Sequence, residues 1–238
     1  MGKERRKIIQ AGQLWMAVQY TAIHTSNPGA RREVRAQISS PARESLNAKL
    51  SWQKLMLTLA CNFRRSDLVV GLDYRESDLP KRREDADRKL TNFINALRKH
   101  RRETGQELIY VRVTEGYHSG GRLHHHLIIN ATGNDYDVIR QLWKYADTVD
   151  FEPFGEDGPE RWGKYLTKEP REKGRRYVGD RTWRCSIHMK KPVVTTEYVD
   201  SRDNLEPPLG AFVVDRSSCE NCYGRFCHIM AVLPELQN

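Results

Sequence analysis

Two histidines and one acidic residue have the spacing of a metal site on a β-hairpin. The apolar stretch LHHHLII carries His124 and His126, and the strand-like stretch LIYVRVTE before it ends at Glu115. Side chains alternate along a strand, so His124 and His126 point to one face while His125 points to the other. Glu115 can add a carboxylate from across the hairpin. Burying imidazoles without partners is costly, which favours metal ligands over a polar patch on a half-exposed strand.

The ligand types narrow the choice of ion. Two imidazoles and one carboxylate suit Mg²⁺ or Mn²⁺ when phosphate and water complete the shell, and they would also accept Zn²⁺. A divalent ion with open positions could polarise the phosphate of a nucleic acid. The sequence therefore predicts a divalent metal as cofactor.

A candidate nucleophile follows in the segment PERWGKYLTKEP, between Pro159 and Pro170. We expect a short helix here, on which Tyr165 and Lys168 share one face by their i, i+3 spacing. A tyrosine hydroxyl is a poor nucleophile at neutral pH, and a neighbouring cation helps it to ionise. Most helical tyrosines only pack against neighbours, so the position beside Lys168 is what favours a catalytic role. Tyr177, in a basic loop, is the rival candidate.

The charge distribution points to a polyanionic partner. The chain of 238 residues has a formal net charge of +9, and residues 161–191 hold 11 Lys or Arg against 3 Asp or Glu. Aromatic residues interrupt this basic segment, which is typical of a surface that follows phosphates and stacks on bases. A charge run is otherwise usually a solvated face. The predicted DNA contacts are Arg122, Lys164, Arg171, Lys173, Arg175, Arg176, Arg181, Arg184, Lys190 and Lys191.

The order of predicted elements indicates an α+β fold. Strands are expected at 67–74 and 148–151 on either side of the hairpin, with helices at about 80–102 and at 135–145. This β-α-β-β-α-β order is that of a ferredoxin-like antiparallel sheet. One or two further helices are expected after Pro41. We divide the chain into a basic arm (1–43), a main domain that includes the N-terminal helices (44–195), and a linker with a cysteine-rich tail (196–238).

The combination of these features resembles the HUH endonuclease superfamily. His124-His125-His126, an acidic residue nine positions earlier, and the downstream Tyr165-x-x-Lys168 are similar to rolling-circle replication initiators of phages and small single-stranded DNA replicons. Further segments that fit are Asn62-Phe63, Val70-x-Leu72-x-Tyr74 and the stretch from Trp183 to Pro192. The similarity covers roughly residues 44–195. It departs from the pattern at His125, where a large apolar residue is usual, and at Asp73, where threonine is common.

The resemblance implies a function. Tyr165 would cut one DNA strand at a replication origin, stay joined to the 5′ phosphate, and leave a 3′ hydroxyl that primes synthesis. The metal ligands would be His124, His126 and Glu115, and whether Asp73 or His125 contributes is left open. The implied partners are single-stranded origin DNA and the helicase and polymerase of a host, since no G-x-x-x-x-G-K-[ST] phosphate loop is present.

Alternatives remain in two classes. A transposase or relaxase of the same superfamily would share the chemistry, whereas a module without enzymatic activity would bind single-stranded RNA or DNA on a ferredoxin-like sheet. The tail offers Cys219, Cys222, Cys227 and His228 with partial zinc-site spacing, against reduced thiols in a small appendage. No membrane-length apolar run or signal peptide is evident, so we expect a cytoplasmic protein in a bacterial host cell.

Overall fold

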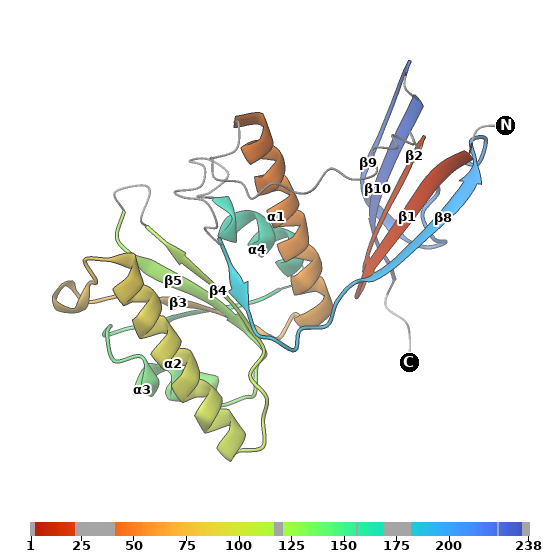
Figure 1. Ribbon diagram of the computed structural model, residues 1–238. Coiled ribbons are helices and arrows are strands. Elements are labelled where there is room, and N and C mark those ends of the chain that lie inside the picture. The colour runs from red at the N-terminus through yellow and green to blue at the C-terminus, as the bar shows by residue number, and fades with distance from the viewer. Residues whose placement is uncertain are drawn as a thin grey trace, which may run out of the picture. The chain divides into compact units, whose positions relative to one another are not determined.

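The computed structural model describes residues 3–21, 41–116, 121–155, 157–168, 182–222 and 224–234. The chain divides into two compact units. One, the terminal unit, joins Met1–Arg35 with Lys190–Asn238, and the other, the central unit, is Ala36–Met189. Each unit contains one five-stranded antiparallel sheet, which confirms the α+β class (Figure 1).

The central unit holds the β-α-β-β-α-β series that the sequence predicts. Its sheet has the strand order β6-β3-β5-β4-β7. The strands are β3 (Leu68–Leu72), β4 (Tyr110–Glu115), β5 (His124–Ile129), β6 (Asp150–Pro153) and the short β7 (Arg184–Cys185). The helices are α1 (Pro41–Asn62), α2 (Arg83–Glu103), α3 (Asp135–Leu142) and α4 (Gly158–Leu166), with a 3₁₀ turn η1 (Glu76–Asp78).

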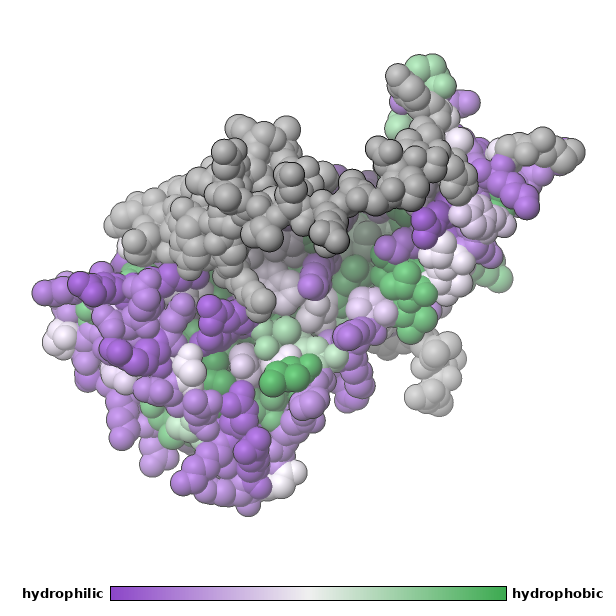
Figure 2. Space-filling view, viewed as in Figure 1, coloured by the Kyte–Doolittle hydropathy of each residue, from purple (hydrophilic) through white to green (hydrophobic). Residues whose placement is uncertain are grey.

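Helices cover both faces of this sheet (Figure 1). On one face, Leu90 and Leu97 of α2 and Ile139 of α3 pack with the buried Leu72 and Leu127 of the strands. Successive strand residues face opposite sides, so the alternate strand residues form a second core under α1 and α4. Figure 2 shows mainly hydrophilic residues over α2, as expected for a helix that buries only one face.

The second core lies between α1, α4 and the sheet. Leu55 and Leu59 of α1 and Trp162 of α4 are buried there with Val69 of β3. Close contact between the two helices depends on Gly163, where a Cβ atom would stand only 3.3 Å from the side chains of Met56 and Trp52. These contacts with α1 and with the sheet hold α4 in place over β3 and β5.

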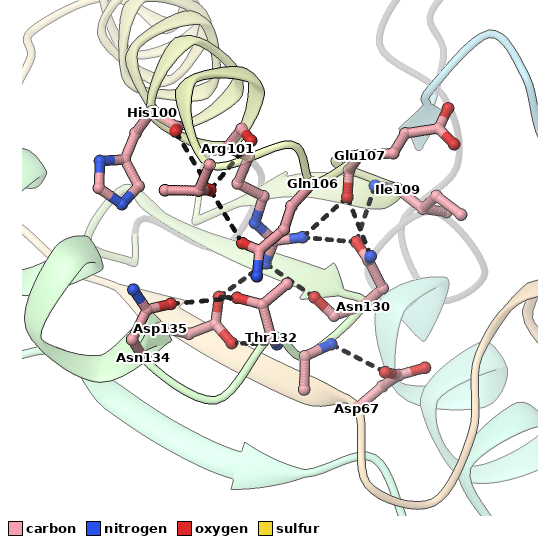
Figure 3. A network of polar contacts seen from close by, with 12 residues as sticks. Asp67, His100, Arg101, Gln106, Glu107, Ile109, Asn130, Thr132, Asn134 and Asp135 are labelled. Atoms are coloured by element: carbon pink, nitrogen blue, oxygen red, sulfur yellow. Dashed lines mark hydrogen bonds and ion pairs between the residues drawn. The ribbon is translucent and has the colours of Figure 1, made fainter.

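A buried arginine ties α2 to the ends of β5 and α3 (Figure 3). Arg101 is 1% exposed and donates to the Asn130 side-chain and backbone oxygens at 2.7 Å. It also pairs with the buried carboxylate of Asp135 at 2.7 Å. The Asn130 side chain in turn accepts a hydrogen bond from the backbone of Ile109, just before β4. This network fixes the ends of β4 and β5 opposite the hairpin connection.

Removing this arginine is expected to destabilise the central unit strongly. Arg101→Met leaves the Asp135 carboxylate buried without its cation, and breaking such a pair costs about 3–5 kcal/mol of unfolding free energy. Urea unfolding followed by circular dichroism measures the change. Arg102→Met, at the exposed neighbouring position, is the control and should shift the midpoint little. Equal midpoints for both variants would contradict a structural role for the network.

The terminal unit is a sheet that the sequence analysis did not anticipate. Its strand order is β8-β1-β2-β10-β9, so the first and last strands of the chain lie in one sheet. The strands are β1 (Lys3–Ala11), β2 (Leu14–Thr21), β8 (Val193–Asp200), β9 (Phe212–Asn221) and β10 (Gly224–Val232). Residues 3–11 and 14–21, expected within a peripheral arm, are thus strands, and residues 193–195, expected in the main domain, begin β8.

The core of the terminal unit is small and polar at one end. Trp15 and Ile229 are buried with a few smaller apolar residues on one face of the sheet. At the other end of that face, the buried Glu4 accepts hydrogen bonds from Gln19 at 2.7 Å and from Arg225 at 2.9 Å. Arg225 also donates to the backbone oxygen of Ser201 at 2.8 Å, which holds the segment after β8 against the sheet. Among the described helices, none has the length and apolar character needed to cross a membrane.

Candidate active site

Antiparallel pairing of β4 with β5 brings the predicted ligands together. Glu115 pairs directly with His124, and Val113 pairs with His126, so the carboxylate and both imidazoles lie on the face that α4 covers. Gly116, the residue directly after Glu115, has a positive φ of +93° at the start of the hairpin connection. A Cβ atom at this position would overlap the Arg122 carbonyl. Only glycine adopts this backbone without strain, and the hairpin can therefore begin its connection directly after the acidic residue.

The ligand atoms have the separation that one ion requires. The Glu115 Oε2 atom is 3.5 Å from His124 Nε2 and 3.6 Å from His126 Nε2. Atoms bound to one ion at about 2.1 Å stand roughly 3–3.5 Å apart. Glu115 Oε1 and His126 Nε2 are buried and have no hydrogen-bond partner within the described ranges. Unpartnered buried polar atoms are costly, so the residues fit a divalent cation.

Hydrogen bonding orients the first imidazole. His124 Nδ1 lies 2.9 Å from the Arg122 carbonyl oxygen, which can only accept, so Nδ1 carries the proton. The lone pair of Nε2 then faces Glu115, as in metal sites where a second partner fixes the ring. Burial alone would raise the pKa of Glu115, but the neighbouring His124 and His126 rings lower it to about 2. The nearby Glu115 carboxylate is the main cause that raises the pKa of His124.

His125 belongs to the opposite face of the sheet. Its side chain is fully buried, and Nε2 accepts a hydrogen bond from the Tyr74 hydroxyl at 2.6 Å. Nδ1 lies 2.9 Å from Thr114 Oγ1, which donates to Asp87 at 3.0 Å. Burial is the largest cause that lowers the pKa of His125 to about 3, so the ring is neutral at pH 7. His125 therefore anchors β5 from behind and does not reach the three grouped side chains.

Tyr165 lies directly above the histidines. Its ring stands edge-on to that of His126 with centroids 5.1 Å apart, and 44% of the residue is exposed. Burial raises the pKa of the Tyr165 hydroxyl, and the negative charges of Glu115 and Glu152 raise it further. A cation bound next to Glu115 would act in the opposite direction. The helix that carries Tyr165 is held by Trp162, whose indole nitrogen donates to the Phe154 carbonyl at 3.1 Å.

A pocket of about 280 Å³ joins these residues. Sequence analysis did not select three charged residues of its wall, Asp150, Glu152 and Arg161, because their meeting depends on how β6 and α4 pack. Arg161 lies over the Trp162 ring at 4.8 Å and pairs with Glu152 at 3.0 Å. The only available signal was spacing, with Arg161 one helical turn before Tyr165. The pocket is lined by Val69, Gly71, Asp73, His124, His126, Asp150, Glu152, Arg161, Trp162 and Tyr165.

Filling the floor of this pocket is expected to block access to it. Gly71 pairs with both His126 and Asp150, so a side chain at this position would enter the pocket beside them. If the pocket takes the single-stranded DNA that the sequence predicts as partner, Gly71→Val should reduce that binding by roughly 10-fold or more, because the added methyl groups occupy the volume of the pocket. Crosslinking of a bromodeoxyuridine oligonucleotide to Tyr165 measures occupancy. Mn²⁺ binding serves as the control and should be unchanged, since no ligand is altered; undiminished crosslinking would contradict the assignment of the floor.

The predicted partner of Tyr165 lies beyond the end of its helix. α4 ends at Leu166, with Thr167 as C-cap, so the expected continuous helix through Lys168 is shorter than predicted. Pro170 explains the early end, because proline restricts the residue before it and cannot continue the backbone hydrogen bonding. Lys168 is exposed.

The predicted DNA contacts occupy several environments. The Arg122 guanidinium pairs with Glu76 and donates to the Tyr74 carbonyl, and Lys164 pairs with Glu160 at 2.6 Å. Arg184 is an exposed residue of β7, and Lys190 and Lys191 belong to the terminal unit. Outside the described residues lie Arg171, Lys173, Arg175, Arg176, Arg181 and the alternative nucleophile Tyr177.

Within the described residues, the candidate zinc ligands of the cysteine-rich tail are not grouped around one point. Cys219, Cys222 and Cys227 have free thiols on the β9–β10 hairpin. Cys227 and His228 are consecutive strand residues and so point to opposite faces, while His228 Nδ1 lies 3.3 Å from Asp215. In the part of the chain that the structure describes, the one group of three or more suitable ligands is Glu115, His124 and His126.

Comparison with known proteins finds one family model that matches the segment containing this site. Residues 67–170 match the family model described as replication-associated protein ORF2/G2P. The match runs from the start of β3 to just beyond α4 and includes Glu115, His124, His126 and Tyr165. No curated protein and no solved structure matches the chain. The resemblance to replication-associated proteins is therefore confirmed over this segment.

Proposed function

We propose that this chain, which matches the model of replication-associated proteins over residues 67–170, initiates rolling-circle DNA replication by nicking and rejoining single-stranded DNA at an origin. The observation that carries the proposal is the position of Tyr165. The centroid of its ring lies 5.1 Å from that of His126, which is grouped with the second imidazole and the carboxylate of the candidate metal site. A hydroxyl nucleophile beside a site suited to a divalent cation is the arrangement that phosphodiester transfer needs.

Glu115, His124 and His126 would hold the cation, which we propose to be Mg²⁺ or Mn²⁺. When bound, the ion would neutralise charge on the non-bridging oxygens of the scissile phosphate. The chain supplies the remaining requirements. The Arg122 carbonyl keeps His124 in the tautomer that offers Nε2. The buried His125, hydrogen-bonded to Tyr74 and Thr114, holds β5 in the register that presents both ligands.

The proposed reaction exchanges one phosphate ester for another. The Tyr165 hydroxyl oxygen forms a bond to phosphorus and gives up its proton, while the bond from phosphorus to the 3′ oxygen breaks and that oxygen gains a proton. The products are a 5′-phosphotyrosine on Tyr165 and a free 3′ hydroxyl. Attack by a 3′ hydroxyl reverses the exchange and joins DNA ends. Arg161 in the pocket wall and the exposed Lys168 are proposed to balance phosphate charge.

The architecture of the central unit supports an HUH endonuclease. In its sheet, the four strands of the β-α-β-β-α-β series lie in the order β6-β3-β5-β4, which is fourth, first, third and second along the chain, as in ferredoxin-like folds. The ligand-bearing strands β4 and β5 are adjacent, and the helix that carries Tyr165 covers the same face. Origin DNA, a host helicase and a host polymerase remain the predicted partners.

A covalent-adduct assay tests the proposal. Full-length protein is incubated with a pool of single-stranded oligonucleotides or with circular single-stranded DNA, in Mn²⁺ or in EDTA, and separated on a denaturing gel. The expected result is a metal-dependent band that contains both protein and DNA and that nuclease treatment shifts back. Binding without an adduct, in Mn²⁺ and across a broad pool of sequences, would instead favour a module that binds nucleic acid without enzymatic activity.

A further inference from the structure

One face of the terminal sheet carries a row of aromatic and basic side chains. In the register of the sheet, Tyr198 of β8 pairs with Arg5 of β1, Arg5 pairs with Tyr20 of β2, and Tyr20 pairs with Phe226 of β10. Directly paired residues of antiparallel strands project on the same face. The four side chains are therefore consecutive neighbours across four strands, and we call them the aromatic row.

This row lies on the face opposite the core of the unit. Trp15, Ala17 and Ile229 form that core, and they alternate in sequence with the residues on the other face. Tyr198 is 56% exposed and Phe226 is 42% exposed. Two large rings that remain this exposed contribute little to the free energy of unfolding, and their placement in one row across the sheet calls for another explanation.

Basic side chains accompany the rings. Arg5 and Lys7 both project on the face of the row, and within the described residues neither has a carboxylate at ion-pair distance. Arg6, on the opposite face, differs because it pairs with Glu197 at 3.5 Å. The acidic residue of β8 that projects on the face of the row, Asp200, is paired with Arg202 at 3.0 Å. The positive charge of Arg5 and Lys7 is thus available to an external anion.

We propose that the aromatic row is a binding surface for single-stranded DNA, separate from the nicking site. Adjacent strands are about 4.8 Å apart, so Tyr20 and Phe226 are neighbours and Tyr198 stands roughly 10 Å from Tyr20. Unpaired bases stack on such rings regardless of sequence, while cations between them contact the phosphates. Arg5, between Tyr198 and Tyr20, and Lys7 take this second role. All the residues belong to the terminal unit and none lines the pocket that contains Tyr165.

The chemistry of the row separates single-stranded from duplex DNA. In a duplex the faces of the bases are covered by their neighbours, so only phosphates remain for Arg5 and Lys7. A single strand offers both phosphates and open base faces. The surface would therefore hold the strand that is displaced during replication, or the strand next to the nick, without choosing a sequence.

The test measures binding of full-length protein to fluorescein-labelled oligo(dT) by anisotropy. EDTA is present throughout, so no adduct can contribute. Tyr198→Ala combined with Phe226→Ala should weaken binding about 10- to 100-fold, because each stacked base contributes substantially. Arg5→Ala should reduce the slope of log affinity against log salt by about 1. A duplex of equal length should compete poorly.

A matched control separates the row from general loss of exposed aromatic surface. Phe212, in β9, is 74% exposed and pairs with Val232, six residues along β10 from Phe226. Phe212→Ala should bind oligo(dT) within twofold of the unchanged protein. Thermal melts of all variants identify any that are misfolded. Equal weakening by Phe212→Ala, or a double variant that binds as well as the unchanged protein, would overturn the proposal.

The result is independent of the nicking chemistry. His126→Ala should lose metal-dependent adducts yet bind oligo(dT) in EDTA as well as the unchanged protein. The Tyr198→Ala/Phe226→Ala variant should still form the adduct when DNA is saturating. Loss of oligo(dT) binding in His126→Ala with no effect of the double variant would place single-strand binding in the pocket and remove the basis for the aromatic row.

Discussion

Tyr165→Phe is expected to lower the yield of covalent protein–DNA adduct below detection. The substitution removes one oxygen atom and leaves the ring that packs edge-on against His126, so the fold and the metal ligands are retained. Without the hydroxyl no phosphotyrosine can form, and loss of a nucleophile typically costs several orders of magnitude in rate. Denaturing gels with radiolabelled DNA, compared at equal protein concentration, measure the yield. Mn²⁺ binding should be unchanged.

Two further tyrosine variants make this result specific. Tyr136→Phe alters another exposed tyrosine of the central unit, 47% exposed on α3, and should leave the adduct yield unchanged. Tyr177→Phe alters the alternative nucleophile in the basic segment and should also retain the adduct. An adduct that survives in Tyr165→Phe but disappears in Tyr177→Phe would move the nucleophile to residue 177.

His126→Ala is expected to weaken Mn²⁺ binding by roughly 100-fold or more and to abolish metal-dependent nicking. His126 Nε2 is buried, lies 3.6 Å from Glu115 Oε2, and has no hydrogen-bond partner among the described residues, so its lone pair has no other evident use. Loss of a supporting group around a metal already costs 10- to 100-fold in affinity, and loss of a direct ligand should cost at least as much. Isothermal titration calorimetry measures the affinity.

His125→Ala is the matched control for this prediction. The residue adjoins His126 on β5 but contacts Tyr74 and Thr114 on the opposite face. We expect it to lower the unfolding free energy by about 1–3 kcal/mol, because buried polar partners lose their hydrogen bonds. Mn²⁺ affinity of the folded fraction should stay within a few-fold. Equal loss of affinity in both variants would show that the effect comes from the strand and not from coordination.

Much of the central unit could be predicted because its determinants are local. The two-residue alternation in LHHHLII placed His124 and His126 on one face, and the position of Glu115 at the end of the preceding strand indicated a carboxylate from across the hairpin. The helix after Pro80 showed apolar residues at a period near 3.6, and it matches α2. These patterns need no knowledge of distant contacts. The metal itself and the role of Tyr165 stay predictions.

The sheet of the terminal unit could not be predicted, because its first strand lacks the pattern that marks a strand in a sequence. Lys3, Arg5 and Lys7 project from one face of β1, while Glu4 and Arg6 project from the other, so the strand shows no apolar–polar alternation. Glu4 is buried only because Arg225 and Gln19, from distant strands, satisfy it. The wall of the pocket was missed similarly, since Glu152 and Arg161 meet only after β6 and α4 have packed.

The pairing of β2 with β10 has a consequence for the order of events at the ribosome. About 200 residues separate these strands in the sequence, and synthesis at 5–20 residues per second delays β10 by roughly 10–40 s after β2 emerges. During that interval the β1–β2 hairpin exposes the edge that β10 will cover, while the central unit, made in one continuous segment, can already fold. The nicking site would thus mature before the terminal sheet closes, and a nascent chain stalled before β10 would carry an open strand edge prone to pairing with other chains.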